Sequence, residues 1–135
     1  MTGSVDTEAN KKRGYAGEEL AARYLTRKGY QVLARNFHSR FGETDIIAQQ
    51  GEFIIFAEVK LRTEGFLSAP AEAVDRKKRL RLTQTAWVYL LENPTSLQPR
   101  FDLIEIICPA KREGKVLLRH TESAFDAEPL ENVPL

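Results

Sequence analysis

Two apolar segments separated by a short polar break are the feature that most constrains the fold of this chain. Residues 42–48 (GETDIIA) and 53–60 (FIIFAEVK) are rich in β-branched and aromatic residues, and a glycine lies in the break between them. This pattern predicts a β-hairpin. The two-residue turn can fall at Gln50-Gly51 or at Gly51-Glu52, and both registers keep the same side chains on the same face.

Three charged residues occupy this predicted hairpin, where an unpaired charge is costly. Glu58 and Lys60 are two positions apart, so they share one face of their strand. Asp45 joins that face in either register, and the Gly51-Glu52 turn places it directly opposite Glu58. Two carboxylates beside an ammonium favour a divalent-metal site. The alternative is a salt bridge between Glu58 and Lys60 at the end of the strand.

A helical pattern over residues 14–28 supplies a third acidic residue. One side of this helix is apolar and is formed by Leu20, Ala21, Tyr24 and Leu25. Glu18 borders the apolar side and is expected to point toward the hairpin, whereas Glu19 falls on the solvated side. The alternative role for Glu18 is that of a glutamate in the first turn, which complements the helix dipole.

Basic residues gather just before the hairpin and again after it. Five of the six residues 76–81 are Lys or Arg. Cations that face phosphates supply much of the affinity of proteins for nucleic acid, although such a run is also typical of a solvated helix face. The residues expected to bind nucleic acid are Arg35, Arg40, Arg62, Arg76, Lys77, Lys78, Arg79 and Arg81.

Charge is segregated along the chain. Residues 1–120 contain all 20 Lys and Arg, whereas residues 121–135 contain four acidic residues and no basic one. We expect a disordered segment over residues 1–11, one folded domain over 12–125 and a flexible acidic tail over 126–135.

Length and composition exclude several classes of protein. A chain of 135 residues is long enough for one domain with one core. It has no apolar run close to the roughly 20 residues of a membrane span, no signal-peptide pattern at its start, and a single cysteine, which cannot form an internal disulfide. We therefore expect a cytoplasmic protein with no membrane partner.

The remaining patterns alternate between strand and helix. A helix is expected from Pro70 to Leu91, with a core-facing stripe formed by Leu80, Ala86, Trp87, Leu90 and Leu91. Strands are expected over 30–34, 100–107 and 115–118, with loops over 35–41 and 62–69. The predicted fold class is a single α/β domain with a mixed central sheet flanked by helices.

The order of a helix with Gly17-Glu18, a strand with Asp45 and a strand with Glu58-Val59-Lys60 resembles the PD-(D/E)xK nuclease superfamily, which includes restriction endonucleases and archaeal Holliday-junction resolvases. More closely, the chain resembles the small, uncharacterised bacterial YraN-like family. Thr44 stands where that family usually has an aliphatic residue, and Ala57 where valine is common. The matching segments are 17–25, 35–36, 42–48, 56–62, 70–74 and 100–102, within residues 12–120.

The resemblance implies a restriction-endonuclease-like core and a nuclease-like domain over residues 12–125. It further implies a metal-dependent endonuclease that acts on structured or branched nucleic acid. The implied catalytic residues are Glu18, Asp45, Glu58 and Lys60. Mg²⁺ or Mn²⁺ would be bound by the Asp45 and Glu58 carboxylates with the Val59 backbone carbonyl, and by Glu18 through water.

Further expectations concern the role of Lys60 and the partners of this implied nuclease. Lys60, flanked by carboxylates, is expected to stay protonated and to act on phosphate charge. DNA is favoured over RNA as the partner, and a homodimer is one allowed assembly. The alternative function is a catalytically silent nucleic-acid-binding module on the same fold.

Overall fold

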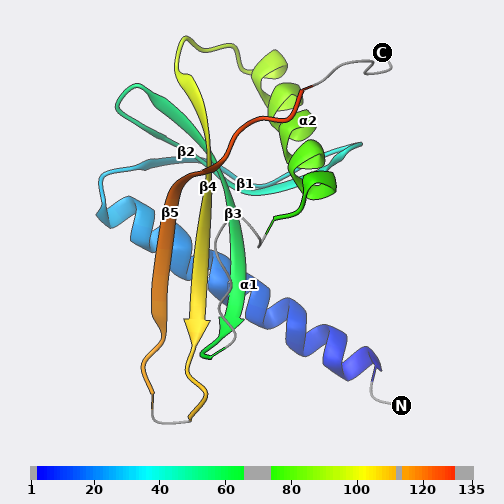
Figure 1. Cartoon of the computed structure of the whole chain (residues 1–135), viewed down its shortest axis with the longest axis vertical. Coiled ribbons are helices and arrows are strands. Elements are labelled where there is room, and N and C mark those ends of the chain that lie inside the picture. Colours follow the sequence, from blue (N-terminus) through cyan, green and yellow to red (C-terminus); the bar gives the residue numbers. More distant parts are fainter. Residues whose placement is uncertain (1–2, 66–73, 112–113, 130–135) are drawn as a thin grey trace.

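The computed structural model describes residues 3–65, 74–111 and 114–129, and these form two helices and a five-stranded sheet (Figure 1). In chain order the elements are α1 (Gly3–Arg27), β1 (Gln31–Ser39), β2 (Gly42–Gln50), β3 (Phe53–Thr63), α2 (Arg76–Glu92), β4 (Gln98–Cys108) and β5 (Leu117–Phe125).

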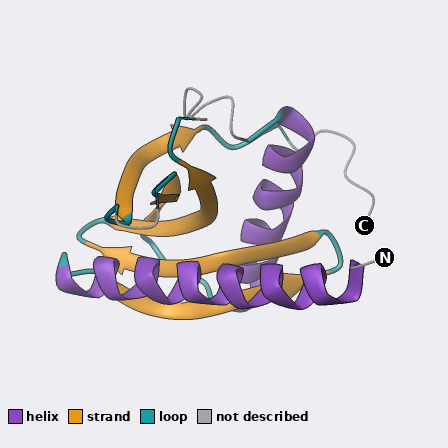
Figure 2. Cartoon of the chain, turned by 90° about the horizontal axis from the view of Figure 1, so that it is seen from below, coloured by secondary structure: helices purple, strands orange, loops and turns teal. Residues whose placement is uncertain are grey.

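The sheet has the spatial order β1-β2-β3-β4-β5. Neighbouring strands are antiparallel except β3 and β4, which are parallel. A parallel pair needs a crossover connection, and the connection between these two strands contains α2. The two helices pack on opposite faces of the sheet (Figure 2). The predicted single α/β domain with a mixed sheet flanked by helices is confirmed.

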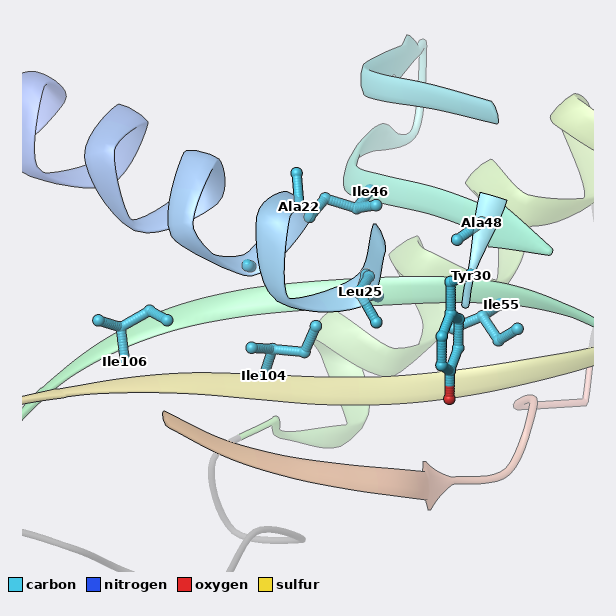
Figure 3. Packing of buried hydrophobic residues seen from close by; sticks show 10 residues of the cluster. Ala22, Leu25, Tyr30, Ile46, Ala48, Ile55, Ile104 and Ile106 are labelled. Carbon is cyan, nitrogen blue, oxygen red and sulfur yellow. The ribbon is translucent and has the colours of Figure 1, made fainter. Parts of the chain in front are cut away.

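The face covered by α1 is apolar. Ala21, Ala22 and Leu25 of the helix are at most 8% exposed and pack on strand residues. Figure 3 shows these contacts from close by. The strand residues on this face alternate along the chain as a pleated sheet requires: Ile46, Ala48, Ile55, Ala57, Ile104 and Ile106. Leu20, which we placed on the apolar side of the helix, is instead 43% exposed.

The face covered by α2 uses other residues of that helix than we predicted. Ala86 and Tyr89 are buried against Ile47, Ile54 and Phe56 of the sheet. The expected core stripe is wrong at Leu80, Trp87 and Leu91, which are exposed. The stripe was misassigned because two polar residues of the buried face, Thr83 and Thr85, are fully buried. A search for apolar residues at helical spacing does not count them, so it selects the wrong face of the helix.

The β2–β3 hairpin has the second of the two registers considered. Gln50 pairs with Phe53 and Ile46 with Ala57, so the turn residues are Gly51 and Glu52. Gly51 has φ 57, and Glu52 is not among the residues with positive φ. Positive φ at the first turn position alone is the requirement of a type II′ turn, which glycine meets without strain.

Both helices differ in extent from the prediction. Helix α1 begins at Gly3, so residues 3–11, expected to be disordered, are helical; this segment contains good helix formers such as Glu8, Ala9 and Lys11. Helix α2 begins at Arg76 rather than at Pro70, because Asp75 is its N-cap and accepts a hydrogen bond from Lys78 N at 2.8 Å. Pro70 lies outside the described residues.

The edge strands are displaced from their predicted positions. β1 extends through Ser39 and includes most of the expected loop 35–41, while β5 begins at Leu117 and runs to Phe125. Polar side chains are tolerated on edge strands with one solvated face, so the polar ends of these strands do not stand out in the sequence. In the part of the chain that the structure describes, no helix is long and apolar enough to cross a membrane.

Candidate metal and nucleic-acid site

Strands β2 and β3 separate at one point, and the candidate site lies at this fork. Their last pair is Ile46 with Ala57, after which β2 remains paired with β1 while β3 continues beside β4. Asp45 is the first residue of β2 beyond the pair, and its Oδ2 accepts a hydrogen bond from Val59 N at 2.7 Å. A carboxylate thus takes the place of the missing strand partner. Since the N–H and C=O of one strand residue point to the same neighbouring strand, the Val59 carbonyl also faces the fork.

The alternation along each strand places three predicted site residues on the face covered by α2. Phe56 packs on that face, so Glu58 and Lys60 share it, and Ile47 assigns Asp45 to the same face. Continuing the hairpin register by one pair puts Asp45 opposite Glu58. Asp45 is 8% exposed and Glu58 is 7% exposed. The structure therefore brings two nearly buried carboxylates together beside a lysine.

The electrostatic cost of this arrangement falls on Asp45. Burial, and then the negative charge of Glu58, raise the pKa of Asp45 to about 8. The Val59 N–H opposes this shift by stabilising the charged form. The negative charge of Asp45 is therefore only partly neutralised by the surrounding protein. A carboxylate in such an environment is typical of the ligands that bind a cation.

Lys60 does not form the salt bridge with Glu58 that was the alternative to a metal site. The partner of Glu58 is Lys78 of α2, whose Nζ lies 2.7 Å from Glu58 Oε1. Among the acidic residues of the described ranges, none lies within ion-pair distance of Lys60. Burial, followed by the charge of Lys78, lowers the pKa of Lys60. Lys60 is therefore not held by the Glu58 carboxylate, because a second lysine, Lys78 of α2, pairs with it.

Glu18 approaches the fork from the opposite face. It belongs to α1 and is half-buried, and its charge contributes to the raised pKa of Asp45. Glu19 points away, as predicted, and pairs with Arg23 at 3.2 Å and with Arg35 at 2.7 Å. Of the two neighbouring glutamates, Glu18 is thus the one near the candidate site.

The donor set at the fork suits a hard cation. Two carboxylates and a backbone carbonyl are the oxygen ligands that Mg²⁺ and Mn²⁺ accept. The Lys78 ammonium, 2.7 Å from Glu58 Oε1, already provides a positive charge at one of these ligands. Within the described residues, no three His, Cys, Asp or Glu side chains converge closely enough to form a metal cluster by themselves. Glu18 is therefore not a direct third ligand in this arrangement.

Several of the predicted nucleic-acid-binding residues are already paired within the protein. Arg62 lies 3.1 Å from the fully buried Glu105, and Arg35 pairs with Glu19 while lying over the Tyr15 ring. These two arginines therefore serve first as structural ion pairs. Glu105 also binds Arg119, which reaches it from β5 at 2.7 Å.

The basic run 76–81 divides into three groups because it wraps around the start of α2. Lys78 faces the fork, and Lys77 and Arg81 are exposed. Arg79 and Arg76 contact Glu128, at 2.9 Å and 3.7 Å. Arg40, also exposed, lies in the β1–β2 turn, which packs on α2 through a 2.9 Å contact between Ser39 Oγ and Thr85 Oγ1. Lys77, Arg81 and Arg40 are thus exposed cations of the described chain at this end of the molecule, with no ion pair to an acidic residue of the described ranges.

The first residues of the predicted flexible tail are anchored. Glu128 N donates to Thr83 Oγ1 at 3.1 Å, and the Glu128 carboxylate lies against Arg79. Glu128 therefore packs on α2, where its carboxylate contacts the basic residues at the start of the helix. Residues 130–135 lie outside the described part of the chain.

Sequence reasoning missed a buried polar network on β4. Asp102 is fully buried and accepts two hydrogen bonds from Arg100, at 2.9 Å each, and one from Ser123 N. His120 Nε2 lies 2.7 Å from it, and His120 Nδ1 lies 3.0 Å from Tyr24 Oη. The signal was present: Arg100 and Asp102 are charges two apart in an apolar strand, the same pattern that drew attention to Glu58 and Lys60.

Thr44, beside Asp45, provides a test of packing near the fork. Its side chain is 1% exposed, and its hydroxyl has no hydrogen-bond partner among the residues that the structure describes. An unsatisfied buried hydroxyl is costly, so Thr44→Val is expected to raise the free energy of unfolding by about 1 kcal/mol. Thr85→Val is the control, since Thr85 is equally buried but bonded to Ser39, and it should lower that free energy. Urea denaturation measures both; equal effects would contradict the assignment.

Comparison with known proteins places the chain in a family. Residues 17–106 match the family model described as Uncharacterised protein family UPF0102. A UPF0102 protein of Alkaliphilus oremlandii is 42% identical over 119 residues, which cover 86% of this chain and 99% of that protein. One from Carboxydothermus hydrogenoformans is 40% identical over 114 residues, or 84% of this chain and 94% of the relative. The chain therefore belongs to the uncharacterised protein family UPF0102.

Proposed function

We propose that this protein is a metal-dependent endonuclease with a restriction-endonuclease-like core of the PD-(D/E)xK type, acting on structured or branched nucleic acid, with DNA favoured over RNA. The observation that carries the proposal is the fork between β2 and β3. There Asp45, Glu58 and the Val59 carbonyl face one another beside Lys60, and both carboxylates are nearly buried. A binding surface for phosphate alone gains nothing from two carboxylates at its centre, since they repel phosphate.

Asp45, Glu58 and the Val59 carbonyl would hold one Mg²⁺ or Mn²⁺ ion. When bound, such an ion polarises the phosphate and stabilises the charge that develops on it. Asp45 is positioned for this role by its hydrogen bond to Val59 N. Glu58 is positioned by the strand register, and Glu18 adds negative charge from the opposite face.

Lys60 supplies positive charge next to this ion site. It is partly buried and has no carboxylate partner within the described residues, so its ammonium is free to meet a phosphate oxygen or orient water. The exposed Lys77, Arg81 and Arg40 would contact flanking phosphates, which gives affinity without base specificity. Recognition of a branched structure by shape suits such a surface.

The second candidate is a catalytically silent nucleic-acid-binding module. It is favoured by one observation, the 2.7 Å ion pair between Lys78 and Glu58. If this pair is permanent, Glu58 is neutralised without a metal ion, and the fork is only a structural ion-pair site.

A cleavage assay distinguishes the two functions. We expect wild-type protein with Mn²⁺ to cut at least one of four substrates: branched, flapped or single-stranded DNA, or structured RNA. Glu58→Gln and Lys60→Ala should each reduce turnover by about 100-fold or more, because each removes charge stabilisation made in the transition state. Lys60→Ala should still bind Mn²⁺ in calorimetry, whereas Glu58→Gln should not.

Two matched substitutions control the assay. Glu52→Gln alters the exposed turn of the same hairpin and should leave cleavage unchanged. Glu18→Gln should impair cleavage, whereas Glu19→Gln, next to it on α1 but paired with Arg23 and Arg35, should not. Binding of these substrates without any cleavage by wild type would reject the nuclease in favour of the silent module.

A further inference from the structure

Lys78 stands where a bound divalent ion would contact Glu58. Its Nζ lies 2.7 Å from Glu58 Oε1, and the two residues come from different elements, Lys78 from α2 and Glu58 from β3. We propose that Lys78 is an exchangeable cation: it neutralises Glu58 in the metal-free protein, leaves when the ion binds, and then contacts a phosphate of the nucleic acid. This inference rests on the proposed function and names a positioning residue for it.

The backbone of Lys78 is held by a helix cap, whereas its side chain is partly exposed to solvent. Asp75 caps α2 by accepting a hydrogen bond from Lys78 N at 2.8 Å. The C-terminal segment braces the same turn through Glu128, which contacts Arg79 at 2.9 Å. The Lys78 side chain is 41% exposed, whereas that of Glu58 is 9% exposed. A flexible four-carbon side chain on an anchored backbone can leave Glu58 without any change in the fold.

Charge crowding provides the reason for Lys78 to leave. Lys78 Nζ lies 2.7 Å from Glu58 Oε1, and Lys60 shares the face of β3 with Glu58, two residues further along the strand. A divalent ion at Glu58 would add two positive charges to these two ammonium groups, and like charges this close repel strongly. Lys60 is anchored in the middle of β3, so the partly exposed Lys78 is the cation that can withdraw.

The exchange makes metal binding and nucleic-acid binding cooperative. Released Lys78 joins the exposed Lys77, Arg81 and Arg40 as a fourth cation on the surface that faces phosphate. Nucleic acid that attracts Lys78 also frees Glu58 for the metal. By thermodynamic linkage, each ligand must raise the affinity for the other by the same factor.

The test is a calorimetric titration of Mn²⁺ into wild type, Lys78→Met and Lys28→Met. Lys78→Met is expected to bind Mn²⁺ about three- to tenfold more tightly than wild type, since it removes a partly exposed competing charge. Lys28→Met removes an exposed charge at the end of α1 that does not contact Glu58, and it should leave the affinity within about twofold. Circular dichroism verifies that both variants keep the wild-type helix content.

Repeating the titration with a four-way DNA junction present tests the linkage. All proteins in this arm carry Lys60→Ala, so that the DNA stays uncut. The junction should raise the Mn²⁺ affinity of the Lys28→Met protein more than that of the Lys78→Met protein, by about the factor seen without DNA. Equal affinities of Lys78→Met and Lys28→Met without DNA would overturn the exchange while leaving the metal site standing. Absence of Mn²⁺ binding by every protein would overturn the proposed nuclease as well.

Discussion

Asp102→Ala is expected to lower the free energy of unfolding by about 3–5 kcal/mol, the cost of breaking a buried ion pair by removing one partner. Asp102 is fully buried and is the shared acceptor for Arg100, His120 and the Ser123 N–H. Arg100, only 10% exposed, would be left without its principal counter-charge. Urea denaturation followed by circular dichroism measures the loss.

Glu122→Ala is the matched control for this prediction. Glu122 lies on the rim of the same network, is 61% exposed, and approaches Arg100 only to 3.9 Å. Its removal should cost less than about 1 kcal/mol, as is typical of exposed pairs. If Asp102→Ala costs no more than Glu122→Ala, the buried network does not stabilise the fold.

The hairpin and its charged face could be predicted because the physics there is local. A strand alternates its side chains between two faces, so a turn of either register places Asp45, Glu58 and Lys60 on the same face of the sheet. The choice between registers depended only on whether Gly51 was the first or second turn residue, and the observed φ of 57 at Gly51 matches its role as the first. No contact from a distant element was needed.

The role of Lys78 could not be predicted, since it depends on where α2 begins. A helix from Pro70 and a helix from Arg76 are both compatible with the sequence, but they present different residues to the sheet. Asp75 decides between them by capping the helix, and this sets Lys78 over Glu58 while Lys77 faces solvent. In the sequence the two lysines are equivalent members of one basic run.

The buried charges of β4 were missed for a different reason. Asp102 and Glu105 are each satisfied by residues of β5, namely His120 and Arg119. Our predicted strand over 115–118 ended before these partners, so the sequence offered no counter-charge for them. Charges in a core strand become interpretable only when the neighbouring strand is correctly placed.

Asp45→Asn is expected to abolish Mn²⁺ binding and at the same time to stabilise the metal-free protein. The pKa of Asp45 is raised from 3.8 to about 8 by burial and by Glu58. The native state therefore takes up a proton, and the stability of wild type falls as the pH rises from about 4 to about 8. Asparagine carries no charge and can still accept the hydrogen bond from Val59 N.

The difference in unfolding free energy between Asp45→Asn and wild type should consequently be smallest near pH 4 and largest above pH 8. There we expect the variant to be more stable by on the order of 2–4 kcal/mol, less than the full shift implies because the fork can relax. Saturating Mn²⁺ should reverse the order, since the ion stabilises only the protein that binds it. Glu52→Gln should track wild type at every pH. If the difference in unfolding free energy between Asp45→Asn and wild type stays constant from pH 4 to pH 9, the pKa of Asp45 is not raised by burial and by Glu58. The main physical argument for a cation site at the fork would then fail.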